Sequence, residues 1–567
     1  MREAGRPPLH RDRFASLPRL SPLHLRAYNL VPVRPLLIID AFASGRCYYI
    51  VTYSLQASRN RICHQHHHAD NGMAEKVDTE RGMRSSPAEE VKFGDISNEA
   101  LTPEEDKRIL RKIDRWLLPV MALSYLFQFL DKSALGFTAI MGLRTDLRLT
   151  GEEYSWSSGI YYFGYLVASY PAAMLMVRWK VGKVITMSVL VWGAVLMLTA
   201  TAFNAGSLLA NRFFLGVTEA AIAPGLTIVV SMWYKRSEQP LRHAAWFLGN
   251  TFAGIFGGLV AYGIGHVETM APWKAVFLTF GAATVAWSVG IYFLLPDTPM
   301  EARFLSRKDR EKAVLRVKEN MTGIKSDKIK WGQVKEALLD AKTWLIVALL
   351  LASCIPNGAV TTFSAIVTEG FGFSTFDTLL LSCVTYLLQL VLVLFATCGS
   401  GYFANSRTYF MALNYVVGVA GAAMVRYVAA ENKWARFVGT VLAGGYSGNF
   451  PLTVSLVSGN VGGFTKKATV NAMCFMAYCA GNIIGPQLFF AREAPEYLSG
   501  FLALMICLAM GFALCWAIRF HLMWENSRRD RVVSADEVAA FEEARHGVMV
   551  NLTDMTDKEI PQFRYVY

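Results

Sequence analysis

Charged residues are scarce in this chain of 567 residues. Asp, Glu, Lys and Arg together make up 18% of it, whereas hydrophobic residues make up 53% and aromatic residues 13%. A soluble domain carries more charge and fewer apolar residues, so the composition excludes an ordinary soluble protein. It indicates an integral membrane protein.

The sequence also lacks the short motifs on which many enzymes depend. It contains no HExxH zinc motif, no paired-histidine membrane motif, no GxSxG nucleophile turn and no glycine loop that would cradle a phosphate. Seven of the nine cysteines fall in apolar stretches without the spacing of metal ligands, and we expect them to act as small apolar residues: Cys354, Cys383, Cys398, Cys474, Cys479, Cys507 and Cys515. We therefore expect a protein that is not an enzyme and that has no metal site and no cofactor.

The net charge of +12 could indicate a nucleic-acid partner. The distribution of the basic residues argues against it, because they gather in alternate loops, such as Arg178 to Lys183, 300–342 and Arg528 to Arg531. The other loops carry mixed or acidic charge. This alternation is the positive-inside pattern of membrane proteins, and it predicts that both termini are cytosolic and that nucleic acid is not a partner.

Apolar stretches begin near residue 116 and end near residue 521. A helix needs about 20 apolar residues to cross a bilayer. By this criterion the sequence predicts twelve transmembrane helices, at 116–138, 155–177, 184–203, 208–232, 242–265, 272–295, 342–367, 377–399, 405–427, 435–458, 468–490 and 498–521. An even number of spans agrees with two termini on the same side.

The spans divide into two sets of six around a long basic loop. We expect an all-α membrane protein with five segments: a cytosolic N-terminal tail (1–115), a six-helix bundle (116–295), a cytosolic central loop (296–341), a second six-helix bundle (342–521) and a cytosolic C-terminal tail (522–567). In the central loop, SRKDREKAVLRVKEN predicts an amphipathic helix that Ser306 caps.

The first 72 residues have an unusual composition. They contain ten Arg, no Lys and six of the ten His of the chain. We expect the tail to be largely disordered. Residues 1–72 have the arginine-rich, acid-poor composition of a mitochondrial presequence, or they are an artefact of the gene prediction with translation starting at Met73 or Met83.

Only a few charges lie inside the predicted spans. FQFLDKSALGF contains Asp131 and Lys132, and NRFFLGVTEAAIAPG contains Arg212 and Glu219. A charge at this depth is costly unless it is paired or hydrated, so each one is a functional candidate. No Asp or Glu lies well inside the last six spans, so if a carboxylate carries a coupling proton, it lies in the first six.

Arg212 and Glu219 are seven residues apart and share one face of a helix with Gly216. Glu219 is the first candidate for proton coupling and Asp131 is the second. Arg212 is expected either to hold an anionic substrate or to pair with Asp131 in a purely structural contact. Lys132 points about 100° away from Asp131 on the helix and ranks lower as a candidate.

Uncharged polar residues supply the other candidates for substrate binding: Tyr125, Asn357, Asn449, Asn482 and Gln487. Amides in membrane helices often only hold helices together, and this alternative stays open for each of them. Gly254 and Gly258 form a GxxxG pair, which predicts close helix packing rather than a substrate contact.

Four stretches carry a family likeness: FLDKSALGF; NRFFLGVTEAAIAPG followed by SMWYKRSEQPLR; NGAVTTFSAIVTEGFGFS; and GNVGGFTKKATVNAMCFMAYCAGNIIGPQLFFAREAPEY. They resemble the anion:cation symporter branch of the major facilitator superfamily, and more narrowly the fungal allantoate and nicotinate permeases, over about residues 95–530. The resemblance implies the major facilitator fold of two six-helix bundles. It also implicates Arg212, Glu219, Asn482, Gly485, Pro486 and Gln487.

We therefore expect a secondary active transporter that takes up a small organic anion, a vitamin or a nitrogen nutrient with protons by alternating access. The expected setting is the plasma membrane, with the protein as a monomer whose partners are the substrate, protons and lipid. One alternative is a polyspecific efflux transporter. It is disfavoured because Leu175 and Trp179 replace the Gly and Asp of the superfamily loop motif G-x-x-x-D-R-x-G-R. The other is a nutrient receptor that no longer transports.

Overall fold

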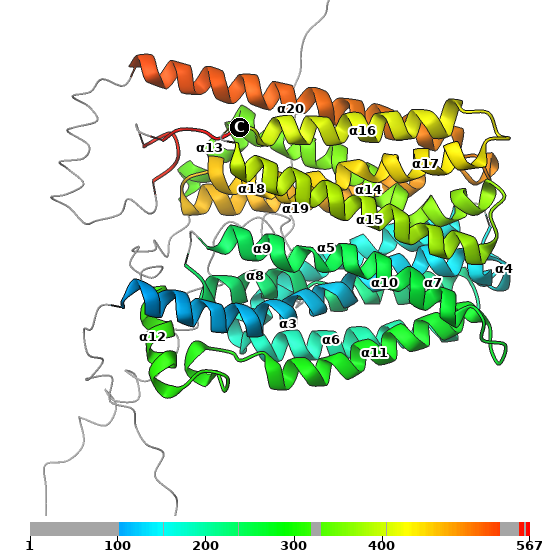
Figure 1. Ribbon diagram of the computed structural model, residues 1–567, viewed down its shortest axis with the longest axis horizontal. Coiled ribbons are helices and arrows are strands. Elements are labelled where there is room, and N and C mark those ends of the chain that lie inside the picture. The colour runs from blue at the N-terminus through cyan, green and yellow to red at the C-terminus, as the bar shows by residue number, and fades with distance from the viewer. Residues whose placement is uncertain are drawn as a thin grey trace, which may run out of the picture.

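The computed structural model describes residues 101–150, 152–235, 238–318, 330–403, 405–532, 555–560 and 563–567. Within these ranges every regular element is a helix, and the long helices lie side by side along one axis (Figure 1). Residues 1–72 and the two candidate start sites, Met73 and Met83, lie outside the described residues.

The helices form two groups in chain order. The first group is α3 (Pro103–Thr138), α4 (Arg144–Asp146), α5 (Glu153–Arg178), α6 (Val181–Leu198), α7 (Ala205–Glu219), α8 (Ile222–Trp233), α9 (Gln239–Phe247), α10 (Gly249–Ile264) and α11 (Pro272–Leu294). The second is α14 (Ala341–Gly370), α15 (Thr375–Tyr402), α16 (Arg407–Tyr427), α17 (Lys433–Ala443), α18 (Phe450–Asn460), α19 (Phe464–Gln487) and α20 (Leu498–Val532). Between them lie α12 (Arg307–Lys318) and α13 (Trp331–Leu339).

Each of the twelve predicted spans coincides with one of these helices or with two consecutive ones. The predicted spans 208–232, 242–265 and 435–458 are each divided in two, as α7–α8, α9–α10 and α17–α18. Among the described residues, nine helical stretches are long and apolar enough to cross a membrane. The remaining predicted spans fall on α3, α5 and α17–α18. In α3, Asp131 and Lys132 lower the mean hydropathy of the apolar stretch.

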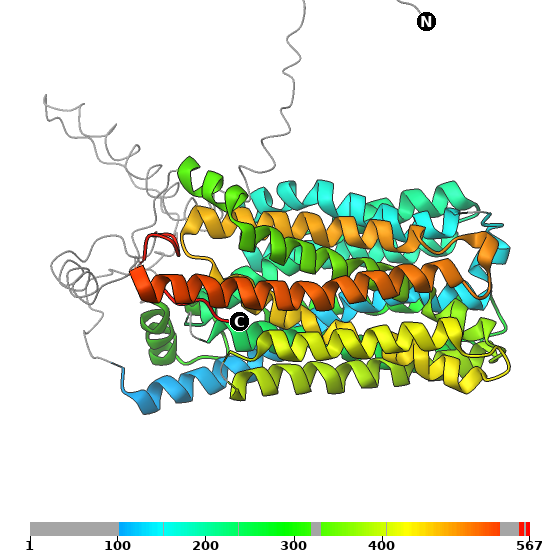
Figure 2. The same cartoon turned by 90° about the horizontal axis from the view of Figure 1, so that it is seen from above.

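The two groups lie on opposite sides of the bundle, with the first group below the second in Figure 1. One end of the bundle holds the start of α3, the end of α20, and both α12 and α13; we call it the terminal end. The other end, where α4 lies, we call the opposite end. Figure 2 shows that the C-terminal residues also lie at the terminal end, beside α20.

Small residues let the two groups approach one another. A Cβ atom added at Gly258 of α10 would lie 2.9 Å from the carbonyl oxygen of Leu379 in α15, and one added at Gly254 would lie 2.2 Å from the Tyr386 ring. Any larger residue would force these helices apart. The GxxxG pair therefore serves helix packing between the groups, as the sequence predicts.

Hydrogen bonds join the two groups nearer the opposite end. The Tyr154 hydroxyl of α5 donates to the carbonyl oxygen of Thr362 in α14 at 2.8 Å, and the Thr362 hydroxyl donates to Ser158 at 2.8 Å. The Ser133 and Tyr386 hydroxyls lie 3.4 Å apart. These contacts hold the groups together on the side away from the terminal end.

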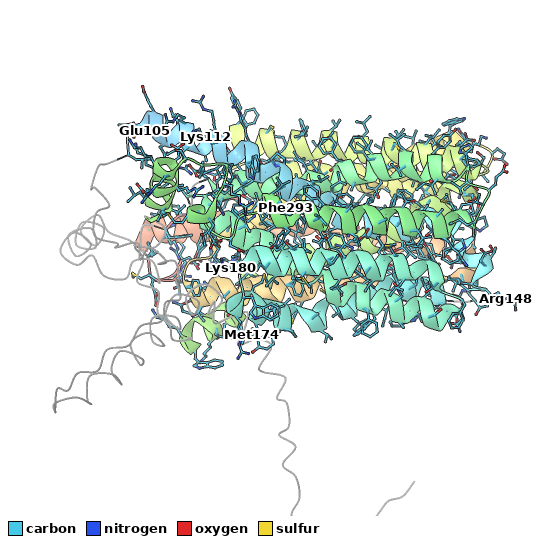
Figure 3. All side chains as sticks on the ribbon, turned by 90° about the horizontal axis from the view of Figure 1, so that it is seen from below. Glu105, Lys112, Arg148, Met174, Lys180 and Phe293 are labelled. Atoms are coloured by element: carbon cyan, nitrogen blue, oxygen red, sulfur yellow. The ribbon has the colours of Figure 1, made fainter. Side chains whose placement is uncertain are left out.

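Charged contacts fasten α12 to the terminal end of the first group. The Asp309 carboxylate accepts from Lys112 at 2.7 Å and from Arg108 at 3.2 Å. Burial alone would raise the pKa of Asp309, but hydrogen bonds from Lys112 and Ser306 outweigh it and lower this pKa. Figure 3 shows Lys112 at this end of the bundle, with Arg148 at the other. The helix that begins after Ser306 is thus held against α3.

The loop between α5 and α6 and the first turn of α6 contact the segment after α11. The backbone N–H of Gly182 donates to the Asp297 carboxylate at 2.8 Å, and the Lys180 ammonium donates to Glu301 at 2.6 Å. A Cβ at Gly182 would lie 2.8 Å from Asp297 Oδ1, so a larger residue there would displace the Asp297 side chain. Although this loop lacks two residues of the superfamily motif, it is still tied to the first group by a carboxylate.

Candidate functional site

Two pairs of charged residues are buried between the helices of the first group. Asp131 and Glu219 are 0% exposed and Arg212 is 2% exposed. The Lys132 side chain is 13% exposed. Asp131 and Lys132 come from α3, whereas Arg212 and Glu219 come from α7. Four charges buried in a membrane-spanning bundle are costly unless they interact, which makes this cluster the candidate functional site.

Glycines bring α5 against α7 and so position the cluster. A Cβ at Gly216 would lie 2.0 Å from the carbonyl oxygen of Tyr161, and one at Gly164 would lie 2.2 Å from the carbonyl oxygen of Phe213. Each glycine thus packs directly against the backbone of the other helix. Because Gly216 and Glu219 are three residues apart on α7, this packing places Tyr161 beside the carboxylate.

Glu219 has two close polar partners. The Tyr161 hydroxyl donates a 2.6 Å hydrogen bond to its carboxylate, and the Lys132 ammonium lies 3.9 Å from the same oxygen. Glu219 is also the last residue of α7, directly before the break that separates α7 from α8. The backbone stays right-handed helical at Ala220 and Ala221, so Glu219 lies within one membrane-length helical stretch.

Lys132 is the nearest cation to Glu219 in the described residues, although the sequence ranked it below the other three. Its ammonium also lies 5.5 Å from the ring centroid of Tyr161 and 5.8 Å from that of Tyr165. A lysine side chain is long enough to reach a neighbouring helix from a position that does not point at it. The direction in which Lys132 projects from its helix therefore did not predict its contacts.

Asp131 and Arg212 do not form the ion pair that the sequence offered as one alternative. Asp131 instead accepts a hydrogen bond from the Trp192 indole N–H of α6. The Arg212 guanidinium lies 5.2 Å from the Phe277 ring centroid, and its Nε and Nη2 atoms have no hydrogen-bond partner among the described residues. Such donors in a buried position are suited to an anionic ligand.

Two of the predicted amides of the second group contact one another. Asn357 of α14 donates to the side-chain oxygen of Asn482 in α19 at 2.8 Å, and Asn482 donates to the Tyr478 carbonyl oxygen at 2.8 Å. A Cβ at Gly358 would lie 2.8 Å from the Asn482 carbonyl oxygen. The amide pair therefore lies within a region of close packing between α14 and α19.

The other two amides differ in their surroundings. Asn449 accepts from Asn414 at 2.9 Å and donates to the Met411 carbonyl oxygen at 3.1 Å, contacts typical of an amide that joins helices. Gln487 has no hydrogen-bond partner in the described part of the chain for either amide atom, although both are buried. Of these two, only Gln487 has donor and acceptor atoms left for a ligand.

Aromatic rings connect the charged cluster with the amides. Tyr162 of α5 packs edge-on against Tyr478 of α19 with ring centroids 5.9 Å apart, and Tyr165 lies 5.6 Å from Phe475. Tyr125 packs edge-on against Trp246 at 4.6 Å within the first group. The cluster and the Asn357–Asn482 pair thus face one another across a layer of aromatic side chains.

The residues that were missed are Tyr161 and Trp192, the donors to Glu219 and Asp131. Both lie in apolar, aromatic stretches, where one tyrosine or tryptophan carries no distinguishing signal. The arrangement as a whole provides carboxylates that can exchange a proton and cations that can hold an anion. In the described residues no group of three His, Cys, Asp or Glu side chains is placed to bind a metal ion.

Comparison with known proteins identifies the family. The profile of the Major Facilitator Superfamily matches residues 121–486. The allantoate permease of Saccharomyces cerevisiae is 33% identical over 478 residues, covering 82% of this chain and 87% of the permease. A thiamine pathway transporter of the same yeast is 30% identical, covering 84% of this chain and 90% of that protein.

Solved structures agree on the fold. A bacterial homologue of the human lysosomal transporter Spinster superimposes with a TM-score of 0.53 at 13% identity, covering 74% of this chain and 98% of the other. At that identity the likeness concerns the fold alone. Since the profile spans most of the helical region, this chain belongs to the Major Facilitator Superfamily and is a multi-pass membrane transporter rather than an enzyme.

Proposed function

We propose that this chain takes up a small organic anion together with protons, by alternating access of a site between the two helix groups. The observation that carries the proposal is the buried contact of Glu219 with Tyr161 and Lys132, close to an Arg212 guanidinium with free donors. Asp131 lies in the same cluster as a second carboxylate.

Charge balance explains why an anion and a proton would travel together. With both carboxylates ionised, Asp131 and Glu219 balance Lys132 and Arg212, so the buried cluster is neutral. An anion that enters alone adds an uncompensated charge in a setting where such charges are costly. A proton taken up by Glu219 restores neutrality and releases Lys132, which can then join Arg212 in holding the anion.

The substrate class follows from the same residues. Two buried cations favour a ligand with a carboxylate, and the hydrogen-bonding atoms of Gln487 and of the Asn357–Asn482 pair suit an additional polar group. One relative is named for allantoate, a small nitrogen-containing organic anion. We infer a small, nitrogen-containing organic acid as the substrate.

Membrane placement is part of the proposal. Basic residues gather on loops at the terminal end, such as Lys180 (Figure 3) and Lys235, which forms an ion pair with Asp106 of α3, and this favours a cytosolic position for that end and for both termini. We place the transporter in the plasma membrane as a monomer. The opposite end then faces the outside of the cell, from which the substrate is taken up.

The test is uptake by fungal cells that express the full chain. Radiolabelled allantoate, nicotinate, pantothenate and biotin are offered at external pH 5 and pH 7.5, with wild type beside Glu219→Gln. Glu152→Gln, an exposed glutamate at the start of α5, is the matched control. We expect one acid to accumulate faster at pH 5. Glu219→Gln should abolish accumulation but keep the exchange of internal for external acid.

Two results would contradict the proposal. Uptake by wild type that does not depend on pH would exclude proton coupling. Normal accumulation by Glu219→Gln would exclude Glu219 as the coupling group and leave its buried contacts a structural role. A chain that takes up none of the acids at either pH, but is present at the cell surface, would favour a receptor that has lost transport.

A further inference from the structure

The described C-terminal residues, 555–560 and 563–567, pack against the terminal end of the second helix group (Figure 2). Three of their polar residues are buried: Thr556 and Asp557 are 0% exposed and Tyr565 is 3% exposed. A tail that merely trailed from the protein would keep such groups in water, since burying a charge without partners is costly. The segment is therefore held in a specific place.

Asp557 is the centre of this contact. Its carboxylate forms ion pairs with Lys466 at 2.7 Å and with Lys342, and it accepts a 2.7 Å hydrogen bond from the Tyr565 hydroxyl. The backbone N–H of Gly462 donates to it at 3.1 Å. One carboxylate of the tail thus bridges the first turn of α14, the first turn of α19 and the loop that precedes α19.

Two asparagines hold the backbone of the tail. Asn526 of α20 accepts from the Tyr565 N–H and donates to the Tyr565 carbonyl oxygen, each at 2.9 Å. Asn460 of α18 accepts from the Val566 N–H and donates to the Val566 carbonyl oxygen, each at 2.8 Å. Each amide therefore satisfies both backbone groups of one residue, which fixes the register of the segment.

The receiving surface is shaped for this segment. A Cβ added at Gly462 would lie 2.5 Å from the backbone nitrogen of Asp557, so any other residue there would push the tail away. Arg529 of α20 donates to the Tyr565 hydroxyl at 2.8 Å. Salt bridges, paired backbone contacts and a close glycine together form a docking site that is specific for this segment.

The helices that Asp557 bridges also carry the predicted amide pair. Asn357 lies 15 residues after Lys342 on α14, and Asn482 lies 16 residues after Lys466 on α19. At 1.5 Å per residue both amides are about 22–24 Å from the bridge. The tail therefore fixes the spacing, at the terminal end, of the same two helices whose side chains meet at Asn357 and Asn482.

We propose that residues 555–560 and 563–567 form an intramolecular strap, which holds the terminal ends of α14 and α19 together through Asp557 and must release before these ends separate. Closure of the strap slows the separation of these two helix ends within the second group, and its release speeds it. The effect of the strap on transport rests on the proposed function, whereas the effect of the strap on the helix ends does not.

The test measures hydrogen–deuterium exchange on the purified full-length protein in detergent, without substrate. Asp557→Asn is compared with Asp530→Asn, which removes an exposed ion pair between α20 and Arg564 of the same tail. Trypsin cleavage after Lys558 and Arg564 reports whether the tail has detached. We expect Asp557→Asn to be cleaved faster. Backbone exchange should rise about tenfold or more in the first two turns of α14 and α19, as loss of buried ion pairs predicts, and Asp530→Asn should match wild type.

A second variant holds the tail in its docked position without the charge of Asp557. In the Asp557→Asn background, a disulfide between Gly459→Cys and Val566→Cys should tie the tail down, since a Cβ at Gly459 would lie 2.8 Å from the Val566 side chain. Slow exchange at both helix ends should return, and a reductant should abolish it again. The proposal is overturned if Asp557→Asn leaves the tail docked, if the tail detaches without faster exchange at α14 and α19, or if the disulfide fails to restore slow exchange.

Discussion

The Tyr161 hydroxyl donates a 2.6 Å hydrogen bond to Glu219, and the backbones of the helices that carry these two residues touch at Gly216. The position of the carboxylate therefore depends on backbone packing between α5 and α7 as well as on the hydrogen bond itself. Helix packing and the hydrogen bond can be tested separately.

Gly216→Ala should separate α5 from α7. The added methyl group would lie 2.0 Å from the Tyr161 carbonyl oxygen, where only backbone movement can make room. Overpacking of this kind costs about 1–3 kcal/mol, so we expect a lower thermal unfolding temperature and a large loss of uptake. The matched control is Gly206→Ala, near the exposed start of α7, where the nearest contact would be an ordinary 3.6 Å. Equal stability of both variants would contradict the close approach.

Tyr161→Phe should leave the helices in place but remove the hydrogen bond to Glu219. A hydrogen bond to a charged group contributes about 1.5–3 kcal/mol, so proton-driven accumulation should fall by about tenfold or more. Thermal stability should change little, because the ring still packs against Tyr162 and Tyr165. Tyr162→Phe is the control, since its ring faces Tyr478 in α19. If the two variants transport equally well, the Tyr161 hydroxyl has no part in coupling.

Arg212 is predicted to act on substrate affinity. Two of its guanidinium nitrogens have no partner among the described residues, so they are available to an anion. Arg212→Met should raise the KM for the transported acid by about tenfold or more, as expected when a charge-assisted hydrogen bond is lost. Arg212→Lys should keep part of the affinity. Initial uptake rates over a range of acid concentrations separate KM from maximal rate, and an unchanged KM in Arg212→Met would exclude direct binding of the acid.

Much of the fold could be predicted from apolar length alone. Runs of about 20 apolar residues located the twelve helical regions, because a bilayer demands that length whatever the packing. The breaks inside three of them were less visible. Pro224 and Pro451 lie close to two of these breaks. Pro119 and Pro171, however, lie within unbroken helices, so the presence of proline alone does not predict where a helix is divided.

The candidate site was predictable only in part. Asp131, Arg212 and Glu219 stand out because a charge in an apolar stretch is rare. Their partners do not stand out in the sequence, since the contact of Lys132 with Glu219 depends on how the helices pack. The docking of Asp557 was equally invisible, because a polar residue in a polar tail looks the same whether it is free or buried.

The strap also predicts a pH dependence. The Asp557 carboxylate is disfavoured by burial, but the ammonium groups of Lys342 and Lys466 outweigh this and lower its pKa from 3.8 to about 2. A lowered pKa stabilises the folded form at any pH above the unfolded value and loses that effect as pH falls through the folded value. The shift corresponds to about 2 kcal/mol, present in full above pH 5 and lost between about pH 4 and pH 2.

The difference in thermal unfolding temperature between wild type and Asp557→Asn isolates this effect, because every other carboxylate titrates in both proteins. The groups that face Asp557 are Lys342, Lys466, Tyr565 and, through the two lysines, Asp340 and Glu336. We expect the same difference at pH 7.5 and pH 5.5 and a smaller one at pH 3. The strap, which the proposed topology places in the cytosol, would then stay closed at any cytosolic pH above about 5, so an acid-stimulated uptake could not arise from its release. A difference that disappears between pH 7.5 and pH 5.5 would instead place the titration of the strap inside the working range and make it a second origin of pH dependence.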